Sequence, residues 1–128
     1  MNNAKTPNET VINNNDVQDQ SDLKSNEIER QDLRERLKNY ALRIIRLYES
    51  LPKHGAVHVI THQLLRSGTS PGSHYREACR AKSNADFISK IEGGLQELDE
   101  SDYWLELLIE GGFVKKESWN RCAMKQAN

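Results

Sequence analysis

Apolar residues recur every three or four positions along residues 33–51, and this spacing constrains the fold more than any other feature of the chain. Such a repeat places the apolar side chains on one face of an α-helix. Pro52 follows directly and ends the helix, because proline disfavours helical geometry in the residue before it. We predict a helix that begins between Ser21 and Gln31 and extends to about Ser50. The apolar face consists of Leu33, Leu37, Tyr40, Ala41, Ile44, Leu47, Tyr48 and Leu51.

A second helical pattern extends from about Val57 to Cys79. Its middle, residues 67–73, contains two glycines and Pro71, which normally mark a loop. The alternative is a kinked helix whose small side chains allow a neighbouring backbone to approach closely. The composition of this segment does not decide between the two. The apolar face comprises Val57, Ile60, Leu64, Gly68, Gly72, Tyr75 and Ala78 or Cys79.

The third helical pattern has clear signals at both ends. Ser83 is a favourable N-cap, with Asp86 in the first turn, and Gly111–Gly112 followed by Phe113 fits a glycine C-cap with an apolar residue packing back. Its apolar arc is wider than one partner can cover, so we expect this helix to be central. The adjacent glycines at 93–94 each cost about 1 kcal/mol relative to alanine, which predicts close approach of the small residues in the second helix.

A short fourth helix is expected over residues 116–125, and no segment shows a strand pattern. The predicted fold is an all-α, up-down four-helix bundle over residues 23–128. Residues 1–22 form an acidic, asparagine-rich tail that we expect to be disordered. No window approaches 18 consecutive apolar residues, and no signal peptide is evident. With two cysteines and no C-x-x-C spacing, we predict a cytoplasmic protein without a membrane partner.

The net charge of −1 conceals a segregation along the chain. Residues 1–32 carry a net −4, residues 33–82 carry 10 basic and 3 acidic side chains for a net +7, and residues 83–128 carry a net −4. The basic block is suited to attract phosphates, or alternatively to neutralise the acidic third helix. Both interpretations stay open at this point.

No sequence pattern supports catalysis or metal binding. His54, His58 and His62 have metal-ligand spacing, but no Glu lies three residues before any of them, and solvated surface histidines explain them better. Cys79 is interpreted as a small buried residue. We predict no enzyme activity, no metal site and no cofactor.

Polar residues on or beside the buried face of the second helix suggest a network that fixes helix register. Arg66 needs an acidic partner if buried, and Glu97 or Glu100 of the third helix is in position to supply it. The predicted network comprises Gln63, Arg66, Ser70, Glu77 and Glu97.

The stretch from Gln63 to Ala78 resembles the signature of the four helix bundle protein family, first described from proteins encoded in intervening sequences of bacterial 23S rRNA genes. Its approximate pattern is Q-L-x-R-S-x-T-S-[IV]-x-A-N-x-x-E-[AG]. The resemblance covers residues 33–118 and continues through Asp86-Phe87, the stretch 99–107 and Gly112-Phe113. Three positions depart from the pattern, and the resemblance implies one helix over residues 57–79, bent near proline. The departures are Pro71, Ser73 and His74.

The family is similar to the accessory variability determinant of diversity-generating retroelements. That protein is a homopentamer of four-helix protomers that binds nucleic acid and a reverse transcriptase. The resemblance therefore implies a homo-oligomer, with a pentamer favoured, and RNA, DNA or a reverse transcriptase as partners. Apolar residues outside the main stripes agree with contacts between copies. They are Leu42, Ile45, Phe87 and Trp104.

The leading functional hypothesis is a non-enzymatic oligomeric scaffold that contacts nucleic acid through a basic surface. The alternative is a protein-interaction module without a nucleic-acid role, which the pI of about 6.4 favours. The predicted nucleic-acid contacts are Arg34, Arg36, Lys38, Arg43, Arg46, Arg76, Arg80 and Lys82.

Overall fold

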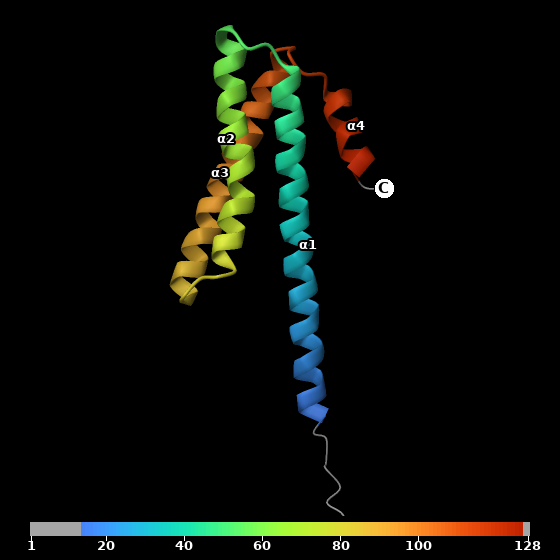
Figure 1. The fold of residues 1–128 in the computed structure, drawn as a ribbon, viewed down its shortest axis with the longest axis vertical. Coiled ribbons are helices and arrows are strands. Elements are labelled where there is room, and N and C mark those ends of the chain that lie inside the picture. The colour runs from blue at the N-terminus through green and yellow to red at the C-terminus, as the bar shows by residue number, and fades with distance from the viewer. Residues whose placement is uncertain (1–13, 127–128) are drawn as a thin grey trace, which may run out of the picture. The chain divides into compact units, whose positions relative to one another are not determined.

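The computed structural model describes residues 14–126, and within them the side chains of residues 18–121. Four helices make up this part of the chain, which contains no strand: α1 (Asn14–Ser50), α2 (Gly55–Ala78), α3 (Asn84–Glu110) and α4 (Lys116–Gln126). Successive helices run in alternating directions and are joined by short connections (Figure 1). The predicted all-α, four-helix fold is confirmed. The chain divides into two units at Leu33, which are described separately.

In the first unit, α1 begins at Asn14, earlier than the predicted start between Ser21 and Gln31. Residues 14–22, expected to lie in the disordered tail, are therefore helical, while residues 1–13 lie outside the described part. Local bonds support this exposed stretch: the Ser21 hydroxyl donates to the Gln18 carbonyl at 2.8 Å, and that of Ser25 to the Ser21 carbonyl at 2.7 Å. Adding residues to an existing helix costs far less than nucleating one, which explains the early start.

In the second unit, α2 continues through Pro71 without a loop, as the family resemblance implied. Three hydroxyls in its middle donate to carbonyls one turn back: Ser67 to Gln63 at 2.8 Å, Thr69 to Leu65 at 2.7 Å and Ser70 to Arg66 at 2.7 Å. Because the hydroxyl groups are satisfied within α2, Ser67 can be fully buried without a polar partner on another helix.

The centre of the core is made by Ile44, Leu64 and Leu108, each with no exposed surface. These residues come from α1, α2 and α3, so the three long helices meet around them. Three further buried residues complete this cluster, from the first turn of α2, the C-terminal part of α3 and the α3–α4 connection. They are Val57, Leu105 and Val114, with Tyr40, Leu47, Leu51, Ile60, Leu65, Trp104, Ile109 and Trp119 packed against it.

Glycines of α2 and α3 mark the closest helix contacts. A Cβ at Gly94 would lie 3.2 Å from the Cβ of His74 and 3.8 Å from the carbonyl oxygen of Pro71. The close approach of α2 to Gly94 is as predicted, but it is made by His74 and the Pro71 backbone and not by the small side chains of α2. The glycines of α2 have a different role from the one expected. Gly68 and Gly72 lie against Ile44 and Leu37 of α1, not against α3.

The predicted ends of α3 are confirmed. The Asp86 backbone N–H donates to the Ser83 hydroxyl at 3.1 Å, and Gly112 has a φ of +80° just after the helix. The residue that returns to the core is Val114, 7% exposed, and not Phe113 as expected. The backbone N–H groups of both residues donate to the Leu108 carbonyl, so the turn brings the second of them inward.

The N-terminal half of α3 is not covered on both sides, contrary to the expectation that this helix is central. Ile88 and Leu95 are each 55% exposed and Phe87 is 37% exposed, whereas the buried residues of α3, Ser101, Leu105 and Leu108, all lie in its C-terminal half. The physical reason is that the α3–α4 connection and Trp119 pack near the C-terminal half of α3 only. Within residues 14–126, no helix is long and apolar enough to span a membrane.

Candidate functional site

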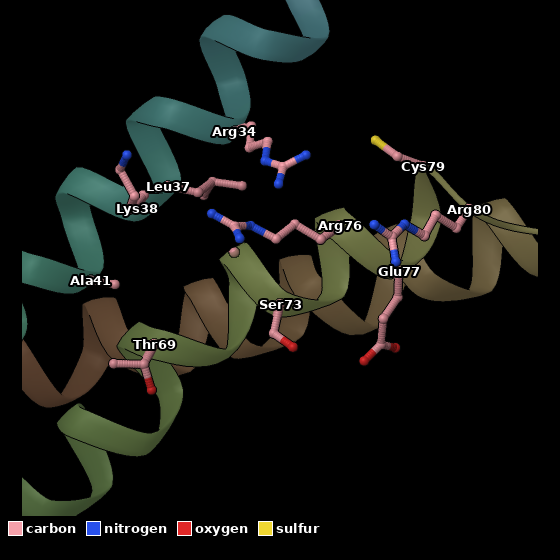
Figure 2. Close-up of a pocket in the computed structure, with 11 residues that line it drawn as sticks. Arg34, Leu37, Lys38, Ala41, Thr69, Ser73, Arg76, Glu77, Cys79 and Arg80 are labelled. Atoms are coloured by element: carbon pink, nitrogen blue, oxygen red, sulfur yellow. The ribbon is translucent and has the colours of Figure 1, made fainter.

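A groove of about 530 Å³ lies between α1 and the C-terminal part of α2. Four basic residues line it: Arg34 and Lys38 from α1, Arg76 from α2, and Arg80 from the turn that follows (Figure 2). We call this feature the basic groove. Its remaining lining is small or apolar apart from Glu77. Those residues are Leu37, Ala41, Thr69, Gly72, Ser73, Glu77 and Cys79.

Helix geometry explains the two basic walls. Arg34 and Lys38 are four residues apart on α1, and residues at this spacing share a helix face. Arg76 and Arg80 are also four residues apart. The turn after α2 keeps them on the same side, because the Arg80 backbone N–H donates to the Glu77 carbonyl at 3.0 Å. Gly72 lies against Leu37 of α1, because a Cβ at Gly72 would make an ordinary contact 3.7 Å from the Cβ of Leu37.

The charges within the basic groove are unevenly neutralised. Lys38 pairs with Glu35 at 2.9 Å, and this hydrogen-bonded contact holds the pKa of Glu35 below its usual value. Glu77 pairs instead with Lys90 of α3 at 3.2 Å, and its carboxylate points away from Arg34 and Arg76 (Figure 2). The Glu77 carboxylate is therefore paired with Lys90 and not with an arginine of the groove, and Glu35 is the acidic group that interacts electrostatically with Arg34 and Arg76.

Three arginines are left without a carboxylate partner. Among residues 18–121, no carboxylate forms a hydrogen bond or ion pair with the side chain of Arg34, Arg76 or Arg80. In Figure 2 the side chains of Arg34 and Arg76 both extend into the space between α1 and α2. Like charges placed together repel, and an anion between them removes the repulsion while accepting hydrogen bonds from both. The arrangement is chemically suited to bind phosphate or another oxyanion.

The structure thus brings together four of the predicted nucleic-acid contacts, Arg34, Lys38, Arg76 and Arg80. The remaining four do not line the basic groove: Arg36, Arg46 and Lys82 are exposed elsewhere, and Arg43 is half-buried. Arg43 instead joins α1 to α4.

Arg43 donates from Nη2 to the Trp119 carbonyl at 2.8 Å, and its guanidinium lies 3.8 Å from the centroid of the Trp119 ring. Tyr40 also contacts this ring edge-on, with centroids 6.3 Å apart. The position of α4 on α1 therefore depends on a cation–π contact and a hydrogen bond from one side chain. Sequence spacing alone gives no signal that distinguishes this arginine from those that face solvent.

A second charged cluster joins α2 to α3. The guanidinium group of Arg66 donates hydrogen bonds to three side chains. Nε donates to Gln63 at 3.3 Å, Nη1 donates to Glu97 at 2.9 Å, and Nη2 donates to Glu100. Trp104 Nε1 donates to Glu100 at 3.1 Å. The hydrogen bond from Arg66 is the main cause that lowers the pKa of Glu100.

Two members of the predicted network lie apart from this cluster. The Ser70 hydroxyl bonds the Arg66 carbonyl of its own helix, and Glu77 pairs with Lys90. Trp104, predicted as a contact between copies, is half-buried against the core, while Leu42 and Ile45 are 39% and 40% exposed.

Cys79 is exposed at the edge of the basic groove, and the prediction that it is buried is wrong. It is the C-cap of α2, and the chain turns there instead of continuing beneath another helix. Between residues 18 and 121, no three His, Cys, Asp or Glu side chains gather in a way that could hold a metal ion.

Comparison with known proteins places the chain in a family. The model of the 23S rRNA-intervening sequence proteins matches residues 29–127. The chain belongs to the 23S rRNA-intervening sequence protein family. A crystal structure of a protein of unknown function from the S23 ribosomal protein family of Bacteroides thetaiotaomicron is similar, with 38% identity and a TM-score of 0.62 over 70% of this chain and 82% of that one. No curated protein matches.

The resemblance stated from the signature between Gln63 and Ala78 is therefore confirmed at the level of the family. Gly68 and Pro71, the residues that made that segment ambiguous, lie within one helix of this family member.

Proposed function

We propose that this family member is a non-enzymatic helical scaffold that binds nucleic acid through the phosphates, using the basic groove. The observation that carries the proposal is the group of three arginines, Arg34, Arg76 and Arg80, that face the groove without a carboxylate partner among the described residues. Arginine suits this task because its planar guanidinium binds phosphate oxygens in a bidentate manner.

The contrast with Arg66 supports this assignment. Arg66 is equally a surface arginine of α2, with 45% of its side chain exposed, yet it is held by two carboxylates of α3. Its charge is used within the fold. The acidic residues of α3 therefore neutralise one part of the basic block, and the part that lines the groove is left for an external anion.

The groove chemistry fits binding that does not depend on base sequence. Phosphate contacts position a nucleic acid but carry no sequence information directly. Affinity that depends on phosphate contacts falls steeply with salt, because bound counterions are released.

The test is a fluorescence anisotropy titration with labelled RNA and DNA at two salt concentrations. We expect binding at about 50 mM salt that weakens at least tenfold at about 200 mM. The variant Arg76→Ala/Arg80→Ala should lose most of the affinity. The matched control is Arg46→Ala, which removes an exposed arginine of α1 outside the groove. Equal loss in both variants would show that the groove is not the binding site.

We also propose that copies of this chain assemble with one another, as the family resemblance implies. The supporting observation is the set of exposed apolar side chains on α1 and α3. Exposed apolar residues that form a contiguous patch mark surfaces of interaction between proteins. Mass measurement in solution tests this directly, and a monomer at micromolar concentration would contradict it. The side chains concerned are Leu42, Ile45, Phe87, Ile88 and Leu95.

A further inference from the structure

We infer that the basic groove takes a single nucleic-acid strand, held by its sugar–phosphate backbone, and does not admit a double helix. This inference rests on the proposed function and specifies which form of nucleic acid the groove accepts. It follows from three features of the described residues: cations on both walls, the limited size of the groove, and the chemistry of its floor.

Cations stand on two opposing walls. Arg34 and Lys38 come from α1, whereas Arg76 and Arg80 come from α2 and the turn after it (Figure 2). A ligand that contacts both walls has to lie between the helices. A flexible single strand can enter such a groove and follow it, which is how positively charged grooves bind single strands in other proteins.

We expect a duplex to rest on the rims of the groove and not to enter it. Its volume of about 530 Å³ lies within the range of clefts that enclose small ligands. A double helix presents a rigid convex surface whose major groove alone is ~12 Å wide. On such a surface the phosphates meet only the rims, so a duplex cannot contact the inward-facing Arg34 and Arg76 together.

The residues between the two walls offer no site for recognition of the bases. Leu37, Ala41 and Gly72 line it with short or apolar side chains, and no aromatic residue is among the lining residues. Bases bound without sequence preference usually stack on aromatic rings, so stacking has no support here. The backbone is then the part of the strand that is held, and the bases face solvent.

The number of cations limits the number of phosphates. Each wall carries two basic residues four positions apart, about 6 Å along a helix axis. At most four phosphates can therefore be neutralised in one groove, and the fourth requires Lys38 to exchange its partner Glu35 for a phosphate. For a single strand, the slope of log K against log salt concentration is about −0.7 per phosphate, so the expected limit is about −2.8.

The experiment titrates the full-length protein with three labelled probes of equal length: oligo-dT, oligo-dA and a blunt DNA duplex, each at about 50 mM salt. We expect oligo-dT and oligo-dA to bind within roughly threefold of each other, and the duplex at least tenfold more weakly. For oligo-dT the salt slope should lie between about −2.1 and −2.8, and removal of Arg76 and Arg80 together should make it shallower by about 1.4. The control Arg46→Ala should leave the slope unchanged.

Three other results are informative, and each contradicts a different claim. Equal affinity for duplex and single strands overturns the inference about the groove but leaves nucleic-acid binding in place. A large preference between oligo-dT and oligo-dA overturns backbone recognition. Absence of binding to all three probes and to the labelled RNA overturns the proposed function itself. Arg34→Ala provides a second, independent removal of a groove cation, and circular dichroism verifies that each variant is folded.

Discussion

The Cγ1 atom of Ile44 on α1 lies 2.8 Å from the position that a Cβ would occupy at Gly68 on α2. Ile44 has no exposed surface and lies at the centre of the core, so it cannot move aside without disturbing Leu64 and Leu108. The contact sets the separation of the two helices, and with it the position of the α1 wall of the basic groove.

Gly68→Ala should therefore destabilise the protein by about 1–3 kcal/mol, the usual cost of inserting a methyl group into a well-packed core. Chemical denaturation monitored by circular dichroism measures the change. The matched control is Gly72→Ala, one turn further along α2, where a Cβ would make an ordinary contact 3.7 Å from that of Leu37. Alanine there should be neutral, or stabilising by up to ~1 kcal/mol through helix propensity. A neutral result at Gly68 would contradict the close approach.

Several elements of the fold could be predicted because their signals are local. The Ser83 cap, the Gly112 turn and the apolar repeat from Leu33 to Leu51 depend on neighbours in sequence. Which helix a glycine faces is not local. Gly68 and Gly72 share a small-residue stretch with Pro71, yet they contact α1 whereas Pro71 contacts α3.

The candidate site shows the same limit. The spacing of Arg34 and Lys38, and of Arg76 and Arg80, predicts two basic helix faces, but not that the two faces oppose each other. That depends on the rotation of α1 about its axis, which Ile44 determines through tertiary packing. In the same way, the sequence does not indicate that Glu77 pairs with Lys90 of α3 and not with an arginine of the groove.

The contact between Arg66 and Glu100 predicts a pH dependence of stability. Arg66 lowers the pKa of Glu100 from its ordinary value of 4.5, so the folded state releases this proton more readily than the unfolded state. The stabilisation is present above pH 4.5 and is lost as the pH falls through the lower pKa of the folded state. Because the groups are partly exposed, the contribution is at most about 1 kcal/mol.

Thermal melts between pH 2 and 6 measure this effect. Arg66→Ala should lose less stability on acidification than the wild-type chain, since the low pKa of Glu100 depends on Arg66. Arg46→Ala is the control, because Arg46 is exposed and lies outside this cluster. Parallel acid curves for Arg66→Ala and the wild type would contradict the role given to the ion pair.

Tyr40 predicts an effect at the other end of the pH range. Burial raises its pKa above the ordinary value of 10.0, although the hydrogen bond to Ser101, 2.9 Å long, opposes the change. The folded state therefore holds the proton more tightly, and the stabilisation present below pH 10 is lost as the pH rises through the higher folded pKa. Tyr40→Phe should remove this alkaline loss in thermal melts from pH 8 to 11.

At neutral pH the same variant should cost about 1 kcal/mol, the typical net contribution of one hydrogen bond. The cost is limited because the buried Ser101 hydroxyl still donates to the Leu98 carbonyl at 2.7 Å. Tyr103→Phe serves as the control, because Tyr103 is 54% exposed. An alkaline transition that is unchanged in Tyr40→Phe would assign the effect to another group.

Cys79 offers a measurement of the basic groove in the unmodified protein. Its thiol is exposed and lines the groove together with Arg34 and Arg76. We expect a strand bound in the groove to cover the sulfur. Only unbound protein then reacts, so the alkylation rate falls in proportion to the unbound fraction. Saturating oligo-dT should therefore slow alkylation of Cys79 by iodoacetamide at least fivefold, roughly the factor expected near saturation. Peptide mass spectrometry after digestion separates Cys79 from Cys122, the other cysteine of the sequence.

The protection should disappear at high salt and in Arg76→Ala/Arg80→Ala, because both remove the phosphate contacts that hold the strand in place. In Arg46→Ala it should persist, since that residue does not line the groove. If Cys79 reacts at an unchanged rate while anisotropy shows that oligo-dT is bound, the strand lies on another surface. The exposed arginines and lysines outside the groove, Arg36, Arg46 and Lys82, then become the residues to substitute.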